Sequence, residues 1–250
     1  MTILMVFVAA FSVMLISLAG VVFTAERLGG WVRGRMTYLA TFSAGVLIIL
    51  AFHLIEESLH EGASTAIVVG AVIAGALFLE IIHRTLPETH HHHELPVGHT
   101  HTPVDGRRVL MSDAVHNVID GFLIVPAFMI DWTIGVAATA GILLHELVQE
   151  ISEFFILKEA GYSNRKALAL NFAASSTILI GVGLALSLAS SELLLSVLTG
   201  IAAGGFLSVV LRDLVPHALE SIKRHGRPMI HVTACIAGLS LMLGVTALVP

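Results

Sequence analysis

The chain has 250 residues, of which 56% are hydrophobic and 12% charged, and its mean hydropathy is +0.91. This composition excludes a water-soluble globular domain, which has no means of burying so much apolar surface. The net charge of -5 gives no reason to expect a nucleic-acid partner, and the single cysteine, Cys235, excludes an internal disulfide.

Eight apolar stretches are long enough to cross a bilayer, which takes about 20 residues of helix. They cover residues 2–24, 37–56, 64–83, 108–129, 133–157, 167–189, 193–214 and 229–249. No Lys or Arg precedes the first stretch, so we expect a retained helix rather than a secretory signal. The sequence predicts an all-α, polytopic membrane protein with one transmembrane domain over residues 1–250.

Basic residues gather in alternate connections between these stretches. All 13 Lys and Arg residues lie in or beside the connections that follow the first, third, fifth and seventh stretch, whereas Asp131 and Glu192 lie in the others. Cytoplasmic loops of membrane proteins carry an excess of Lys and Arg. We therefore expect these four connections to be cytoplasmic and both termini to lie outside.

The one long connection, residues 87–107, is rich in histidine and proline. Histidines occupy positions 90–93, 99 and 101. A polar, Pro-containing segment of this kind is not expected to form a packed element. We interpret it as a cytoplasmic loop that interacts weakly with metal ions.

A faint repeat relates two segments that cross the membrane in opposite directions. Residues 43–57 resemble residues 203–217, with Gly45 and Leu47 matching Gly205 and Leu207. Inverted repeats are common in secondary transporters, whose sites lie near the membrane midplane. Small residues also allow close helix packing, so that alternative stays open.

The fourth and fifth stretches hold unusually polar side chains for membrane helices. These are Asp113, His116, Asn117 and Asp120 in the fourth, and His145, Glu146, Gln149, Glu150 and Glu153 in the fifth. Charged groups in hydrocarbon are costly, so they normally face the bundle interior and are paired or functional. Asp113 and Glu153 lie nearest the stretch ends, where solvation is an alternative to metal binding.

Helical spacing places these residues on shared faces, because side chains four apart are neighbours. The pairs are His116 with Asp120, His145 with Gln149, and Glu146 with Glu150. Imidazole and carboxylate ligands suit zinc, iron and manganese, and the absence of thiolates argues against Cu(I). Weak amide ligands at Asn117 and Gln149 favour an ion that passes over one that is stored.

Three other interpretations of these residues are open. They could form a structural hydrogen-bond network or a proton relay without metal. His145-Glu146 also opens like the H-E-x-x-H motif of zinc proteases, but Gln149 stands where the second His is required. A different zinc-dependent intramembrane hydrolase, with a metal-activated water, is the alternative to transport.

Two segments resemble signatures of the ZIP (Zrt/Irt-like) metal transporters. Residues 113–121, DAVHNVIDG, resemble the fourth-helix signature H-N-x-x-D-G. Residues 145–154, HELVQEISEF, resemble the fifth-helix motif H-E-x-P-H-E-x-x-D-F of one branch, with Val148, Gln149 and Glu153 replacing Pro, His and Asp. The eight crossings and the histidine loop also fit, so the resemblance covers essentially the whole chain.

The resemblance implies transport of divalent transition-metal ions into the cytoplasm, with zinc first and iron, manganese or cadmium as alternatives. It implies no enzymatic activity and no cofactor apart from the transported ion. His116, Asp120 and His145 would form the core of the site, with Asn117 and Glu146 beside it. The resemblance also implies inverted three-helix repeats around central helices four and five, a homodimer, and a transport unit that moves past a scaffold.

Two departures from the family pattern affect the site. With Gln149 in place of His, we expect lower affinity or a changed metal preference. The sixth stretch lacks the carboxylate that completes a second metal position in some members; its polar residues are Asn171, Ser175, Ser176 and Thr177. We therefore do not expect a full two-metal centre.

Polar residues at the ends of two other stretches are candidates for the entrance and exit of the ion. They are His53, Glu56 and Glu57 at the outer end of the second stretch, and Asp213, His217 and Glu220 at the inner end of the seventh. The short chain and compact loops favour a prokaryotic plasma (inner) membrane.

Overall fold

The computed structural model describes residues 1–19, 35–60, 63–85, 106–189 and 191–247, and every regular element in these ranges is a helix. The elements are α1 (Thr2–Ile16), α3 (Met36–His60), α4 (Thr65–Thr85), α5 (Gly106–Ile130), α6 (Trp132–Glu159), α7 (Asn164–Ser175), α8 (Ile178–Leu188), α9 (Glu192–Val209), η2 (Val210–Leu214), α10 (Val215–His225) and α11 (Pro228–Thr246). Within them, eight helical segments are long and apolar enough to cross a membrane. The prediction of a polytopic all-α protein is confirmed.

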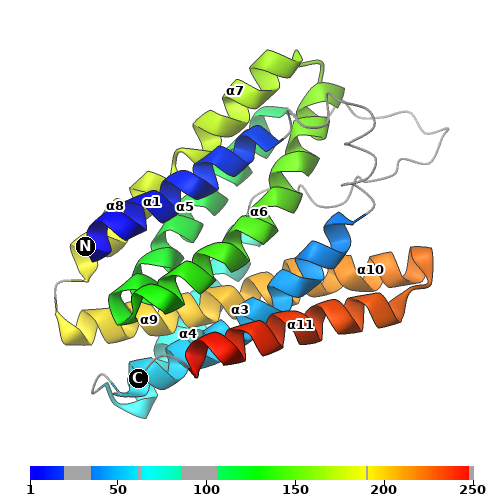
Figure 1. The fold of residues 1–250 in the computed structure, drawn as a ribbon. Helices are drawn as coiled ribbons and strands as arrows, with labels where there is room; N and C mark the ends of the chain where they lie inside the picture. The colour runs from blue at the N-terminus through cyan, green and yellow to red at the C-terminus, as the bar shows by residue number, and fades with distance from the viewer. Residues whose placement is uncertain (20–34, 61–62, 86–105, 190, 248–250) are drawn as a thin grey trace.

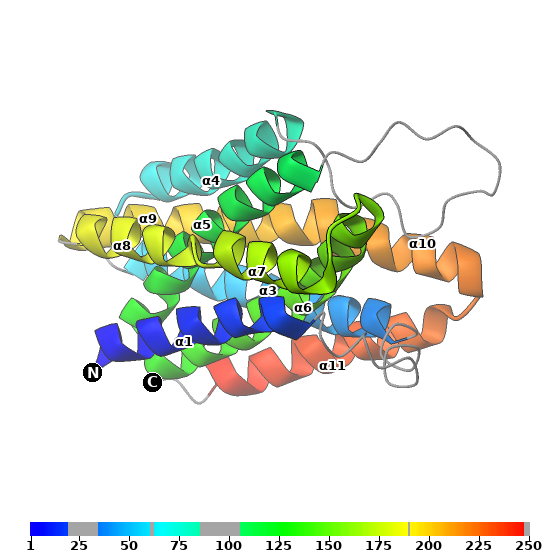
Figure 2. The same cartoon turned by 90° about the horizontal axis from the view of Figure 1, so that it is seen from above.

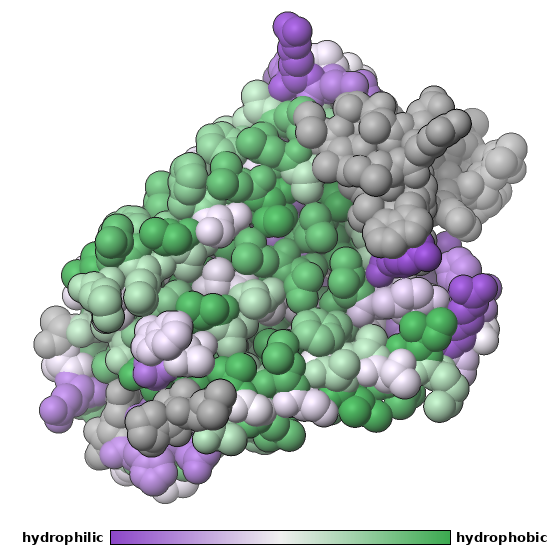
Figure 3. Space-filling model, viewed as in Figure 1, coloured by the Kyte–Doolittle hydropathy of each residue, from purple (hydrophilic) through white to green (hydrophobic). Residues whose placement is uncertain are grey.

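The two ends of the bundle differ in what they carry. The start of α1 and the end of α11 lie at one end, and the tip of α10, with exposed Lys223 and Arg224, lies at the other (Figures 1 and 2). Between the ends, one face of the molecule is covered by hydrophobic residues (Figure 3). A hydrophobic band between polar ends is what a membrane-embedded bundle requires.

Burial divides the helices into a centre and a periphery. The spans of α5 and α6 are each 67% buried, whereas those of α4 and α11 are 22% and 17% buried. The outer helices expose residues such as Ile73 and Leu77 on α4 and Leu241 on α11. The two helices with the densest polar sequence are therefore shielded from lipid by the others.

Glycines let several helices touch backbone to backbone. A Cβ at Gly181 would overlap the carbonyl oxygen of Val118, and one at Gly121 would overlap that of Ile178, so α5 and α8 meet without intervening side chains. Gly45 and Gly238 bring α3 against α11 in the same way. Close packing by small residues is thus one role of these glycines.

The packing pattern agrees with inverted repeats. The second crossing, α3, packs on the eighth, α11, and the seventh, α9, packs on the third, α4. In an inverted repeat of three helices, the second crossing corresponds to the seventh and the third to the eighth. The contact between crossings two and eight then corresponds to the contact between crossings seven and three, and both are present. The two contacts adjoin, because α3 also packs on α9, and the pair α5 and α6 packs beside them, with α6 on α3 and α5 on α9.

The sixth crossing is interrupted where the sequence predicts one continuous helix. α7 ends at Ser175 and α8 begins at Ile178. The Thr177 hydroxyl donates to the carbonyl oxygens of Ala174 and Ala114, the second at 2.5 Å on α5. Hydroxyl side chains compete for backbone groups in this way, and here they stabilise the break beside α5.

The seventh crossing is longer than the predicted 193–214 because it continues through η2 into α10 as far as His225. In η2 the N–H of Val215 bonds to the carbonyl of Val210, five residues back. Pro216 comes next, and since proline has no N–H, the ordinary bond to Arg212 is lost there. The helix therefore continues through a wider turn at this point instead of ending.

Part of the sequence-based prediction falls outside the described residues. The histidine loop corresponds to residues 86–105, which are not described, and Gly106 and Arg107 of the predicted loop belong to α5. The predicted first helix, 2–24, is described as α1 only to Ile16.

Candidate metal centre

A one-residue connection sets the depth of the polar residues. α5 ends at Ile130 and α6 begins at Trp132, so Asp131 alone joins the two antiparallel helices. Asp131 caps α6 by accepting a 2.6 Å hydrogen bond from the N–H of Thr133. His116 lies fifteen residues before this turn and His145 fourteen after it. At about 1.5 Å per residue, both lie roughly 22 Å from the turn and at the same level.

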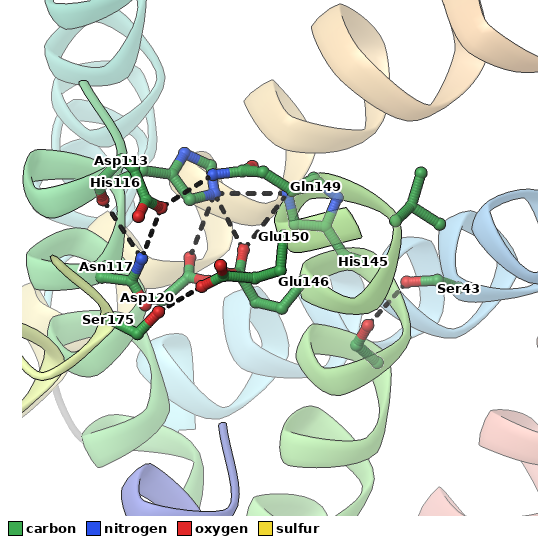
Figure 4. Close-up of polar contacts among 12 residues, drawn as sticks. Ser43, Asp113, His116, Asn117, Asp120, His145, Glu146, Gln149, Glu150 and Ser175 are labelled. Atoms are coloured by element: carbon green, nitrogen blue, oxygen red, sulfur yellow. Dashed lines mark hydrogen bonds and ion pairs between the residues drawn. The ribbon is translucent and has the colours of Figure 1, made fainter. Parts of the chain in front are cut away.

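Four side chains converge at this level between α5 and α6 (Figure 4). The Nε2 atoms of His116 and His145 are 3.2 Å apart. Oε1 of Glu146 lies 3.4 Å from Nε2 of His116 and 3.9 Å from Nε2 of His145. Oδ1 of Asp120 lies 3.9 Å from Nε2 of His116. His116, His145 and Glu146 thus place one ligand atom each within 4.8 Å of the others, and Asp120 lies beside His116.

The separations in this group are close to those of a tetrahedral zinc site. Zinc binds imidazole nitrogen at about 2.0–2.1 Å, so two ligand atoms of a tetrahedron lie about 3.3 Å apart. The His116–His145 and His116–Glu146 separations already match this value. The Asp120 oxygen would have to approach by roughly 0.5 Å, which a small side-chain rotation supplies.

The acidic members of this group have unused oxygens. Both carboxylate oxygens of Glu146 and Oδ2 of Asp120 are buried and have no hydrogen-bond partner among the described residues. Buried polar atoms normally have partners, and these oxygens can act as metal ligands. The chemistry of the donors, nitrogen with carboxylate oxygen, fits a divalent transition metal.

A second group of side chains combines the predicted ligand Glu150 with Asp113 and Glu153, for which solvation at a helix end was the alternative. Asp113, Glu150 and Glu153 each offer a carboxylate oxygen, and these oxygens lie within 4.8 Å of one another. The three residues are each 1% exposed. The alternative that Asp113 and Glu153 are solvated at helix ends is therefore wrong.

The two predicted amide ligands contact this second group. Asn117 donates through Nδ2 to Oδ1 of Asp113 at 2.8 Å, and Gln149 donates to the same oxygen at 3.4 Å. The side-chain oxygens of both amides have no partner in the described part of the chain. Gln149 also lines a cavity with His145, so it lies between the histidine group and the carboxylate group.

The sixth crossing contributes hydroxyl and amide groups to the surroundings of Glu150. Ser175 donates a short hydrogen bond to Oε1 of Glu150, and Asn171 donates to the backbone oxygen of Glu150 at 3.2 Å. Ser176 and Thr177 bond instead to backbone oxygens. Two of the four polar residues singled out in this helix thus orient Glu150.

A model of the ZIP zinc transporter family matches residues 87–246 of this chain. The chain belongs to the ZIP family. The prediction that the chain is a ZIP family member is thereby confirmed.

Relatives within and beyond animals match somewhat more than half of the chain. Human zinc transporter ZIP4 is 34% identical over 139 residues, which is 54% of this chain and 21% of the relative. IAA-alanine resistance protein 1 of Arabidopsis thaliana is 35% identical over 138 residues, 55% of this chain and 28% of the relative. Human metal cation symporter ZIP14 is 31% identical over 142 residues, which is 56% of this chain and 29% of the relative. The chain therefore spans less than a third of the length of these ZIP relatives.

In this ZIP chain the predicted exit residues share a cavity with the site. Asp213 and His217 line it together with His145 and Gln149. The cavity thus leads from the histidine group toward the start of α10, on the side of the bundle where Lys223 and Arg224 are exposed. Glu220 is instead exposed and paired with Arg224 at 2.6 Å.

The predicted entrance residues lie near the far end of α3, away from this cavity. Glu56 is exposed, whereas His53 and Glu57 are half-buried. Nε2 of His53 is buried and has no hydrogen-bond partner among the described residues. The structure does not bring these three side chains into the groups on α5 and α6.

Two polar contacts were not anticipated from the sequence. Glu80 on α4 accepts from Arg212 on η2 at 2.5 Å and from Arg84 at 2.6 Å. His231 on α11 is buried and contacts Thr41 at 2.7 Å and Ser221 at 3.1 Å. The sequence shows that Glu80 and His231 are polar residues in apolar helices, which indicates that each needs a partner. It does not show which partner, because Arg212 and Thr41 are distant in sequence.

Proposed function

We propose that this chain carries divalent transition-metal ions across the membrane, zinc foremost, with iron, manganese or cadmium as further substrates. The observation that carries the proposal is the buried pair His116 and His145, whose Nε2 atoms are 3.2 Å apart, with Oε1 of Glu146 lying 3.4 Å from that of His116. A donor set already spaced for zinc, in the middle of a membrane span, suits an ion in passage.

We assign His116, His145, Asp120 and Glu146 as the ligands of the travelling ion. Asn117 and Gln149 supply weak amide oxygens beside them, and Glu150 lies one turn further along α6. The weak ligands help the ion to leave, because transport requires release as well as binding. His53, Glu56 and Glu57 are the proposed entrance, and Asp213 and His217 the proposed exit.

The names of the relatives support this function. ZIP4 is named a zinc transporter and ZIP14 a metal cation symporter. We infer movement into the cytoplasm, because the Lys and Arg residues lie in alternate connections. The ion is cargo rather than a resident cofactor.

The proposal extends to the setting of the protein. We place the chain as a homodimer in the plasma (inner) membrane, with both termini outside, and treat residues 1–250 as one transporter domain. The histidine-containing residues that precede α5, 87–105, would be a cytoplasmic metal-interacting segment. The alternative of a zinc-dependent hydrolase is not retained, because neither the family nor the names of the relatives support it.

The test is metal uptake by purified protein in liposomes. Zinc entry is followed with a trapped fluorescent indicator, and iron, manganese and cadmium are added as competitors. We expect saturable zinc uptake that cadmium and iron reduce, and no uptake by liposomes with the His116→Ala, His145→Ala double variant. Equal uptake by the variant and the unmodified protein would contradict the proposal.

A further inference from the structure

Three carboxylates without an assigned role lie beside the histidine group. Asp113, Glu150 and Glu153 place one oxygen each within 4.8 Å of the others. Both oxygens of Glu153, Oδ2 of Asp113 and Oε2 of Glu150 are buried without a hydrogen-bond partner among the described residues. Three buried carboxylates at such distances repel one another strongly unless a cation or protons neutralise them.

An independent feature points into the same group. The side chain of Gln149 is buried, and its Nε2 donates to Oδ1 of Asp113 at 3.4 Å. Its Oε1 is left without a hydrogen-bond partner among the described residues. An amide oxygen beside three carboxylates is a fourth oxygen donor, and oxygen donors of this kind hold hard divalent cations.

The group lies on one particular side of the histidines. Asp113 precedes His116 by three residues on α5, while Glu150 and Glu153 follow Glu146 by four and seven on the antiparallel α6. Because the two helices are antiparallel, all three carboxylates are displaced from the histidine group toward the same end of the bundle, by roughly 5–10 Å. That end carries the exposed Lys223 and Arg224 and is the proposed cytoplasmic side.

We propose that Asp113, Glu150 and Glu153 form a second cation site with oxygen ligands only, which receives the ion from the histidine group on its way inward. The binding site stands by itself, whereas its place in the path rests on the proposed transport function. Gln149 lies between the two sites, since it lines the cavity beside His145 and bonds to Asp113 (Figure 4).

The absence of a helix-six carboxylate does not prevent a second ion from binding here. The three acidic ligands come from α5 and α6, and the sixth crossing supplies only orientation. Ser175 donates to Oε1 of Glu150 and Asn171 to its backbone oxygen, which fix this side chain toward Asp113.

The donor types predict different preferences at the two sites. Nitrogen with oxygen suits zinc, whereas carboxylate oxygens alone also suit manganese, calcium or magnesium. Manganese is therefore a useful probe, because its paramagnetism reports whether nitrogen lies in its coordination shell. A divalent ion would neutralise two of the three carboxylate charges.

The experiment is manganese binding to the purified full chain in detergent, with pulsed electron paramagnetic resonance as the readout. For the unmodified protein we expect two populations of Mn²⁺, one coupled to ¹⁴N and one not. The His116→Ala, His145→Ala double variant should lose only the nitrogen-coupled population. Glu153→Gln should weaken the nitrogen-free population by about tenfold or more, a typical loss for a disturbed metal shell. Glu192→Gln, an exposed acidic residue at the start of α9, is the matched control and should change neither population.

Thermal unfolding separates a metal site from a structural cluster. Without metal, Glu153→Gln should melt at the same temperature as the unmodified protein or higher, because one repelling charge is gone. It should also lose the stabilisation that Mn²⁺ gives. Unchanged Mn²⁺ binding in Glu153→Gln, or no nitrogen-free Mn²⁺ in the double variant, would overturn the second site. Absence of zinc flux with the nitrogen-free population intact would instead overturn only the transport proposal.

Discussion

His116 and His145 face each other across the interface of α5 and α6, with their Nε2 atoms 3.2 Å apart and both rings buried. At this distance the two Nε2 atoms cannot both carry a proton, because two N–H groups would then point at each other. At least one Nε2 is therefore unprotonated, and a cation held by both rings would take the lone pair of each Nε2 in place of this contact.

Removal of single ligands should stop zinc transport without unfolding the protein. His116→Ala, His145→Ala and Asp120→Ala should each reduce zinc flux in liposomes by about tenfold or more, since each removes one donor from a buried set. Circular dichroism should show an unchanged helical content, because the substitutions spare the lipid-facing surfaces.

The matched control for this series is His60→Ala, at the exposed end of α3. It should leave flux unchanged. If all three ligand variants fold, reach the liposomes and carry zinc at the unmodified rate, the ion path lies elsewhere and the cluster is a packing or proton-handling network.

Introducing a histidine at Gln149 should tighten zinc binding. Gln149 is one turn from His145 and lines the same cavity, so Gln149→His adds a nitrogen donor near the ion. Transport kinetics should show a severalfold lower half-saturating zinc concentration together with a lower maximal rate, because a more firmly held ion leaves more slowly. A raised half-saturating concentration would contradict the placement of this side chain at the site.

Two glycines on α8 should respond differently to the same substitution. A Cβ at Gly181 would overlap the carbonyl oxygen of Val118, whereas a Cβ at Gly183 meets nothing within 4 Å. Gly181→Ala should destabilise the protein by about 1–3 kcal/mol, seen as a lower melting temperature in detergent. Gly183→Ala should melt at the same temperature or slightly higher, since alanine favours a helix. Equal melting of the two variants would argue against the close approach of α5 and α8.

The cap of α6 should contribute stability that depends on pH. Hydrogen bonds from Thr133 hold the pKa of the Asp131 carboxyl below its usual value. A lowered folded-state pKa adds stability above the unfolded value of about 3.9, and this is lost as the pH falls through the folded value. Asp131→Ala should therefore cost about 1 kcal/mol near neutral pH, with a smaller difference below a pH of about 3.9.

Asp131→Asn is the control for the charge, because asparagine caps helices about as well as aspartate. It should retain most of the stability, without the loss at low pH. Melting temperatures of the three proteins across this pH range provide the measurement. A difference between Asp131→Ala and the unmodified protein that stays constant with pH would exclude the ionised cap.

Cysteine labelling should report the orientation of the chain. In a Cys235→Ala background, His60→Cys should react with a membrane-impermeant reagent from outside, and Lys223→Cys only after permeabilisation. Both positions are exposed, at opposite ends of the bundle. The reverse pattern would invert the direction of transport inferred from the basic residues.

Much of the fold can be predicted from the sequence because crossing a bilayer is a one-dimensional requirement. A run of apolar residues such as 37–56 must be helical, and its length is set by the membrane. The helix breaks were not predictable in the same way. The interruption at Ser176 and Thr177 depends on a hydrogen bond to Ala114, which is remote in sequence.

The site was only partly predictable from the sequence for a related reason. Spacing of four residues placed His116 and Asp120 on one face of α5, but no rule of spacing separates ligands of one ion from those of another. The division into a histidine group and a carboxylate group depends on the one-residue turn at Asp131, which sets α5 and α6 in register. The burial of Asp113 and Glu153 likewise required the neighbouring helices.

The π segment η2 makes the seventh crossing tolerant of a change in its number of residues. Before it, Gly204 packs against the carbonyl of Val72, and after it α10 presents Lys223 to water. A π turn takes up about one extra residue in a single wider turn, so the α-helical parts on either side keep their facing. Deleting one residue from 210–214 would restore a regular helix and leave the basic face of α10 toward water. A homologue that lacks this extra residue would pass the same point as a regular helix and could keep its charged side chains on the same face of α10.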